Sequence, residues 1–472
     1  MSELAKGTET LAQGLKTRHI RMLSIAGVIG AGLFVGSGHA IAQAGPAVIL
    51  AYLVAGALVV VIMRMLAEMA VNSPDSGSFS TYATRALGRW AGFSIGWLYW
   101  WFWVLVIPLE ANAAGSILHH WFPSIAIWQF TLVITVILTI SNLFSVKNYG
   151  EFEFWLALIK IGAIIAFLLL GAVAIFGLMP SSQISGISHL YDTGGFMPKG
   201  IGAVIAAILT TMFSFMGTEI VTIAAAESRN PSREISRATN SVIWRISLFY
   251  LLSILFIVAL VPWNAEALTR QGSWQTVLQL MNIPHAQFIV DAVVLTAVCS
   301  CLNSALYTSS RMLYSLACRQ DAPVFAARLN SAGTPYIAVL LSTGMAFITV
   351  IANYIAPARV FEFLLASSGA IALLVYLVIA CSHLVLRRRS EACGECLQFK
   401  MWLFPGLTLL IIAAIIGVLL SMLLMPEHRS EIIATTLLAV LVVLSGLVVH
   451  RRQRIKQQNW QRYQSIQTVD HR

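Results

Sequence analysis

Residues 22–38 read MLSIAGVIGAGLFVGSG, an apolar segment interrupted by five glycines. Each glycine weakens a helix by about 1 kcal/mol relative to alanine. One interpretation is close packing between membrane helices, which small residues permit. The other is a helix that breaks near Gly30, Ala31 and Gly32. A break leaves backbone N–H and C=O groups unpaired, which a bilayer tolerates only where these groups line a cavity or bind something.

A second segment, at residues 210–228, has the same character and reads TTMFSFMGTEIVTIAAAES. Gly217 lies in its middle, with Phe213 before it and Glu219 after it. It is the sixth apolar segment, five after the first. Interruptions at corresponding positions of two five-helix halves predict an inverted-repeat transporter. The exposed N–H groups and the positive helix ends suit a carboxylate, and the exposed C=O groups suit an ammonium, so the pair of breaks favours a zwitterionic ligand.

The rest of the chain indicates an all-α polytopic membrane protein. Of its 472 residues 58% are hydrophobic and 11% charged, with a mean hydropathy of +0.80. A soluble domain has roughly a quarter of its residues charged, so lipid must cover this surface. Apolar runs long enough to span a bilayer number about twelve, and they do not alternate as β-barrel strands do. These runs lie near residues 22–40, 46–70, 94–118, 125–145, 153–178, 202–225, 241–262, 287–310, 336–355, 360–384, 402–424 and 432–450.

The basic residues predict the orientation. If the N-terminus is cytoplasmic, 25 of the 30 Lys and Arg residues lie on the inner side, four lie outside, and Lys160 falls within a run. This bias matches the positive-inside rule. We therefore expect a multi-pass protein of a bacterial inner membrane with both termini in the cytoplasm. We expect a leader at 1–18, a transporter domain at 19–450 with repeats at about 19–180 and 201–385, and a basic tail at 451–472, disordered or at the surface.

Several segments resemble the amino acid–polyamine–organocation superfamily. They are SIAGVIGAGLFVGSG followed by AGPAVILAYL, then PDSGSFSTYA, VKNYGEFEFW, FSFMGTEIVTIAAAES and SRMLYSLA. Within that superfamily, GRWAGFSIGWLYWWFWVLVIPLEAN at 88–112 and TSSRMLYSLA at 308–317 are similar to the bacterial 4-aminobutyrate (GABA) permeases. The resemblance covers roughly residues 14–450.

The resemblance implies a leucine-transporter-type fold, with ten core helices in two inverted repeats plus two more, and proton-coupled uptake of GABA. It implies that the substrate carboxylate meets the amides of Gly30, Ala31 and Gly32. It also implies that the ammonium meets carbonyls near Ala26, Gly27, Val28, Phe213 and Ser214, with Phe213 as a gate beside the Gly217 break. Proline, β-alanine, lysine or an aromatic amino acid stays open as the substrate, and so does exchange instead of symport.

Charged side chains inside a membrane cost free energy, so each one requires a structural or functional explanation. Lys160 matches the fifth-helix lysine that replaces a sodium ion between the first and eighth helices in some proton-driven relatives. Burial would make its proton easier to release; the alternative is that it snorkels or pairs permanently with Glu153. Glu219 holds the broken helix or binds a proton, Glu110 faces the pocket or pairs with a neighbour, and Glu153 is a candidate gate residue.

The remaining patterns argue against other classes of protein. There is no phosphate-binding Walker loop, so we expect no ATP coupling, and no hydrolase signature occurs, so we expect no enzyme. We predict no cofactor, no metal and no nucleic-acid partner, only the amino acid, the proton and the bilayer. The tryptophans from Trp97 to Trp103 are interpreted as an interfacial belt. A channel would give uncoupled flux, and a nutrient sensor would bind without flux.

Overall fold

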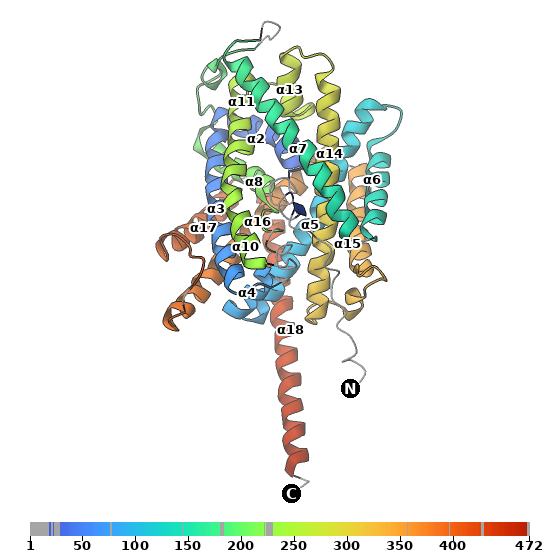
Figure 1. Cartoon of the computed structure of the whole chain (residues 1–472), viewed down its shortest axis with the longest axis vertical. Coiled ribbons are helices and arrows are strands. Elements are labelled where there is room, and N and C mark those ends of the chain that lie inside the picture. Colours follow the sequence, from blue (N-terminus) through green and yellow to red (C-terminus); the bar gives the residue numbers. More distant parts are fainter. Residues whose placement is uncertain are drawn as a thin grey trace.

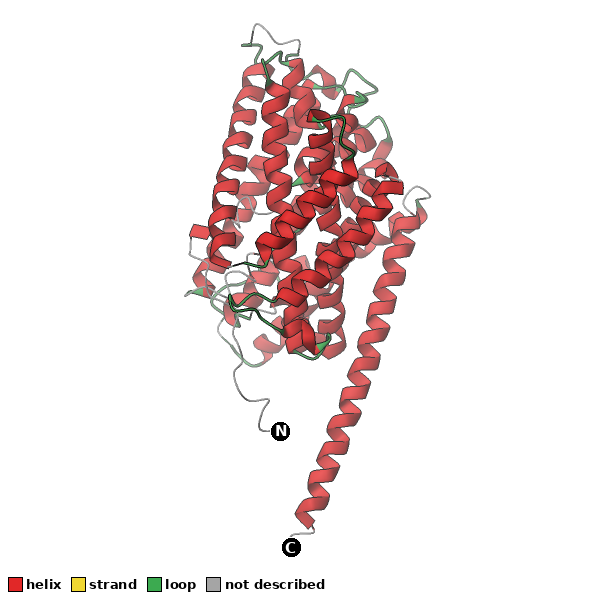
Figure 2. Cartoon of the chain, turned by 90° about the vertical axis from the view of Figure 1, so that its right-hand side faces the viewer, coloured by secondary structure: helices red, strands yellow, loops and turns green. Residues whose placement is uncertain are grey.

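The computed structural model describes residues 18, 19, 22, 29–75, 78–144, 146–179, 184–220, 222, 230–355, 357–395, 397–425 and 429–469. These residues form helices and connecting loops without a β-strand (Figure 2). Each of the twelve predicted runs is helical over most of its described residues, because apolar sequences in lipid must satisfy their backbone groups within a helix. The prediction of an all-α twelve-helix fold is confirmed.

The first half of the fold contains the first five predicted runs. Its elements are η1 (Gly32–Gly36), α2 (Ser37–Ala44), η2 (Gly45–Ala47), α3 (Val48–Asn72), α4 (Ser78–Leu87), α5 (Arg89–Trp121), α6 (Ile127–Asn142) and α7 (Val146–Ile175). A short η3 (Ser188–Leu190) lies in the loop that leads to the second half.

The second half repeats this order and adds two helices. Its elements are α8 (Gly200–Phe215), α10 (Pro231–Arg245), η4 (Ile246–Leu251), α11 (Leu252–Leu260), α12 (Ala267–Arg270), α13 (Ser273–Leu280), α14 (Ala286–Cys318), η5 (Val324–Ala327), α15 (Tyr336–Ile355), α16 (Pro357–Ala392), α17 (Gly406–Leu424) and α18 (Arg429–Val469). Among the described residues, eight helical stretches are long and apolar enough to cross a membrane, with η1 to α3 counted as one, and α6, α8 and part of α15 are shorter apolar helices.

Burial separates the centre of the bundle from its edge. In the most apolar 18-residue segment of α5, 89% of the residues are buried inside the bundle, against 22% in that of α17 and 17% in that of α18. The central α5 packs along α14 and also contacts α4, α6, α15, α16 and α18. A helix enclosed on all sides holds its side chains in fixed positions, and this suits α5 to carry part of a site.

The C-terminal tail forms part of a helix. We expected the residues after about 450 to be disordered or to lie at the surface; α18 continues as one helix to Val469. Figures 1 and 2 show this helix projecting beyond the bundle, at the end opposite α13. Residues 451–469 are rich in Gln and Arg, which are good helix formers and extend a helix that the apolar span has already nucleated.

Candidate functional site

A helix begins where the sequence analysis placed the first break. Ile29 and Gly30 are not helical, and η1 begins at Gly32 with Ala31 as its N-cap. The amide of Ala31 therefore lies at a helix N-terminus, where N–H groups are unpaired and the helix dipole is positive. Three residues predicted to bind the ammonium, Ala26, Gly27 and Val28, lie outside the described residues.

The amide of Ala31 is bound by a carboxylate of the protein itself. Glu110 of α5 accepts hydrogen bonds from Ala31 N at 2.9 Å and 3.1 Å, one to each oxygen, and only 1% of Glu110 is exposed. A Cβ at Gly30 would lie 2.5 Å from Glu110 Oε1 and 2.6 Å from Cys301 Cβ. Glycine at position 30 thus permits the approach of Glu110 and α14 to the break. Glu110 does face the pocket, as one of its two predicted roles required.

A cation of the protein lies on the other side of the same break. Lys160 of α7 donates hydrogen bonds to the Ile29 carbonyl at 3.3 Å and to Ser300 Oγ of α14 at 2.7 Å. Its Nζ lies 3.6 Å from Glu153 Oε1, and Ser300 Oγ donates to the same carboxylate. Both ionic side chains are buried, so each depends on the other for compensation. Lys160 thus contacts the first and eighth predicted helices and also pairs with Glu153, so both interpretations given in the sequence analysis stay open.

A carboxylate of the protein also binds a backbone amide at the second break. The helix α8 ends at Phe215, and Gly217 takes a φ of +101°, a conformation that strains any other residue. Gly217 N donates to both oxygens of Glu219 at 3.0 Å, and Tyr376 OH donates to Glu219 Oε2 at 3.4 Å. Because Glu219 and Gly217 are two residues apart, this carboxylate closes the break locally.

Replacing Glu219 by alanine is expected to destabilise the protein. The substitution leaves the buried Gly217 N–H without this partner, which costs about 1–3 kcal/mol. Thermal unfolding of the purified protein in detergent measures the loss, with Glu266→Ala at an exposed position just before α12 as the matched control. An unchanged unfolding temperature for Glu219→Ala would show that Glu219 does not hold the break.

The two breaks contact one another. A Cβ at Gly32 would lie 2.8 Å from Ser214 Cα and 3.1 Å from Phe213 Cδ1, so only glycine admits the end of α8 at this distance. Between them is a cavity of about 10 Å³, room for about one water molecule. Its lining residues are Gly32, Phe102, Trp103, Val106, Glu110, Phe213, Ser214, Met216 and Cys301. The predicted residues that do not line it are Gly30, Ala31, Gly217, Glu219, Lys160 and Glu153.

Four lining residues were missed by the sequence analysis: Phe102, Trp103, Val106 and Met216. The interpretation of the tryptophans as an interfacial belt is wrong for Trp103, which is 1% exposed and faces the cavity. α5 runs through the centre of the bundle, so its aromatic residues meet protein rather than headgroups. Trp103, Val106 and Glu110 are spaced three and four residues apart, and this helical spacing was the signal for one face of α5.

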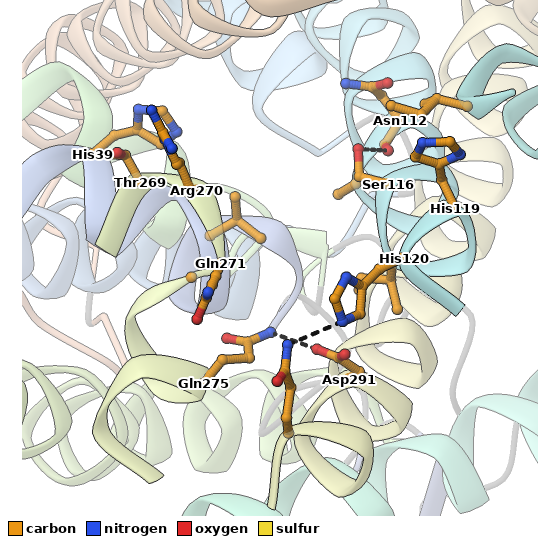
Figure 3. A pocket seen from close by; sticks show the side chains of 16 residues that line it. His39, Asn112, Ser116, His119, His120, Thr269, Arg270, Gln271, Gln275 and Asp291 are labelled. Atoms are coloured by element: carbon orange, nitrogen blue, oxygen red, sulfur yellow. Dashed lines mark hydrogen bonds between the residues drawn. The ribbon is translucent and has the colours of Figure 1, made fainter. Parts of the chain in front are cut away.

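A wider polar vestibule opens toward the α13 end of the bundle, with a volume of about 510 Å³. Figure 3 shows Asn112, Ser116, His119 and His120 on one wall and Gln271 and Gln275 on another. Asp291 accepts from Gln275 Nε2 at 3.2 Å and lies near His120 (Figure 3). Val35, one turn after Gly32, also lines this space, so the vestibule leads toward the first break.

The other end of the bundle is joined by charged contacts. Arg18 forms an ion pair with Glu151 at the start of α7, and His19 Nε2 lies 3.2 Å from the same carboxylate. Arg387 of α16 lies 3.0 Å from Glu68 Oε1 of α3. These contacts connect the N-terminal segment to α7, and α3 to α16.

Known proteins resemble this chain over most of its length. The amino acid permease family profile matches residues 19–460. A "Gamma-aminobutyric acid permease" of Escherichia coli (strain K12) is 64% identical over 94% of this chain and 96% of its own. A "Probable GABA permease" of Pseudomonas aeruginosa is 63% identical over 95% and 94%. An aromatic amino acid transport protein of Corynebacterium glutamicum is 42% identical over 95% and 97%.

A solved structure supports the fold independently. A manganese transporter of Eremococcus coleocola superposes with a TM-score of 0.55 at 13% identity, over 93% of this chain and 94% of that one. At this identity the likeness concerns the fold alone, and it agrees with the predicted transporter fold class.

Proposed function

The chain belongs to the amino acid permease family, whose members are transporters rather than enzymes, and we propose that it imports GABA together with a proton. The observation that carries this proposal is the contact between two helix breaks, at Gly30–Gly32 and at Phe215–Gly217, in the middle of a twelve-helix bundle. Each break presents backbone groups that recognise charge, and a small cavity lies between them. Such a site suits a small zwitterion.

The choice of GABA rests on the named relatives. The two GABA permeases are more than 60% identical to this chain, whereas the aromatic amino acid relative is 42% identical. The cavity wall agrees with a substrate that lacks a side chain, because Phe102, Trp103 and Phe213 fill the space between the breaks. Another amino acid, or exchange of two amino acids, is the alternative.

Proton coupling is proposed from the buried charges. Lys160 contacts the Ile29 carbonyl, Ser300 and Glu153, so a change in its protonation acts directly on the first break and on α14. In this account Lys160 and an acidic residue carry or sense the proton. A buried pair of this kind is costly unless it serves a purpose, and ionisable groups inside membranes commonly serve proton transfer.

We place the protein in the bacterial inner membrane with both termini in the cytoplasm. The positive-inside bias supports this orientation. It puts the basic end of α18 and the Arg18–Glu151 pair inside, and it puts the vestibule and α13 outside. In this orientation the vestibule opens toward the periplasm and reaches Val35.

The test is uptake of radiolabelled GABA into proteoliposomes under an inward proton gradient. We expect accumulation that a protonophore collapses and that excess proline, lysine or phenylalanine leaves unchanged. Loss of GABA uptake in the presence of one of these competitors would reassign the substrate and keep the mechanism. Binding of GABA without any flux would contradict a transporter and indicate a sensor, and flux that never exceeds equilibrium would indicate a channel.

A further inference from the structure

We propose that Glu110 is an internal competitor of the substrate and the residue that binds the coupling proton. In the structure its carboxylate occupies the Ala31 amide, the group expected to receive the substrate carboxylate. Binding of a proton to Glu110 would release this amide, and the substrate carboxylate would take its place. This inference rests on the proposed function and names the acidic residue that the function leaves open.

The geometry shows that Glu110 and a ligand carboxylate exclude each other. Both Glu110 oxygens lie within 3.1 Å of Ala31 N, in the arrangement that an anion adopts at a helix N-terminus. The adjoining cavity of about 10 Å³ has room for about one water molecule and is too small for an amino acid. A ligand can therefore bind between the breaks only if Glu110 withdraws and Phe213 or its neighbours move aside.

The two breaks differ in how their carboxylates are attached. Glu219 is two residues from the amide that it binds, so it cannot leave without changing its own loop. Glu110 is 79 residues from Ala31 and arrives from another helix. Pro108 lies two residues before it, inside α5. Proline removes one helical hydrogen bond and makes a helix bend more easily, so α5 has a weak point beside the residue that must move.

Neutralising Glu110 would preserve the charge balance around the break. The titratable groups that interact with Glu110 are Lys160 of α7, Cys299 and Cys301 of α14 and Tyr250 of η4. When a proton from the vestibule binds the Glu110 carboxylate, its negative charge is replaced by that of the substrate. Lys160, which also pairs with Glu153, thus keeps a carboxylate near it at the break in both states. On the inner side Glu110 loses the proton, returns to Ala31 and displaces the substrate.

The mechanism depends on the strength of the competing hydrogen bonds. A charged carboxylate binds an N–H about twice as strongly as a neutral acceptor does. A protonated Glu110 is thus a weak competitor for a zwitterion's carboxylate, and an ionised one is a strong competitor. Substrate affinity should then rise as the pH falls, by up to about tenfold per pH unit for one linked proton.

The decisive variant is Glu110→Gln, which keeps the side-chain size and removes the proton site. We expect GABA binding to purified E110Q to lose its pH dependence and to exceed wild-type affinity at high pH. In proteoliposomes we expect E110Q to exchange internal for external GABA but not to accumulate it under a pH gradient. Glu395→Gln, the same change at an exposed position, serves as the matched control and should behave as wild type.

Three results would overturn the inference. They are a wild-type affinity for GABA that does not vary with pH, an E110Q variant that still accumulates GABA under a pH gradient, and a folded E110Q that binds no GABA at any pH. The first needs no variant, so it decides the matter even if E110Q does not fold. If the wild-type protein neither binds nor transports GABA, the proposed function itself fails; if wild type is coupled and E110Q remains coupled, only the inference fails.

Discussion

Lys160→Met is expected to abolish the accumulation of substrate under a proton gradient. The methionine keeps most of the side-chain volume but removes the cation that contacts Ile29 O, Ser300 Oγ and Glu153. Uptake driven by an imposed pH gradient measures the effect. Lys199→Met provides the matched control, because Lys199 is an exposed lysine near Trp263, away from both breaks.

Loss of stability must be separated from loss of coupling in this experiment. Removing one member of a buried ion pair costs about 3–5 kcal/mol, since the other charge is left without its partner. The double variant Lys160→Met with Glu153→Gln removes both charges. We expect it to regain much of the unfolding temperature without regaining accumulation. Wild-type accumulation by either variant would contradict a role of Lys160 in coupling.

Gly32→Ala is expected to reduce uptake at least about tenfold. The new Cβ would lie 2.8 Å from the Cα of Ser214, and a backbone atom cannot move aside as a flexible side chain does. Overpacking of this kind costs about 1–3 kcal/mol, and here the strain falls on the contact between the two breaks. Initial rates of GABA uptake by equal amounts of folded protein measure it.

The neighbouring glycine of the same element is the matched control for Gly32. A Cβ at Gly36 would meet no heavy atom closer than 3.6 Å, so Gly36→Ala should transport normally. Equal rates for both variants would show that the contact between the breaks is not needed for transport. A loss in Gly36→Ala as large as that in Gly32→Ala would indicate that η1 tolerates no added methyl group anywhere.

Much of the fold could be predicted because lipid imposes a simple rule on sequence. Apolar runs must become helices, and glycine-rich interruptions that recur five runs apart predict broken helices. Lys160 stood out because a charge inside an apolar run is costly, and its expected position came from the family resemblance. These features depend on local composition or on a single costly charge, both of which are visible in one chain.

The partners of the charged residues could not be predicted in the same way. The hydrogen bond between Glu110 and Ala31 joins residues that are 79 positions apart in the sequence, and no local sequence pattern around either residue predicts it. The place of Trp103 at the cavity depends on α5 being central, which follows from packing and not from its own apolar pattern. The extension of α18 to Val469 was missed because a polar segment without periodicity still continues a helix that is already formed.

The central claim is that the substrate binds between the two breaks after Glu110 has withdrawn. A structure determined at saturating GABA and low pH tests it most directly. The account predicts the GABA carboxylate within hydrogen-bonding distance of the Ala31 amide, and Glu110 no longer bound to that amide. GABA bound elsewhere, for example among Asp291 and Gln275 of the vestibule, with Glu110 still on Ala31, would contradict it.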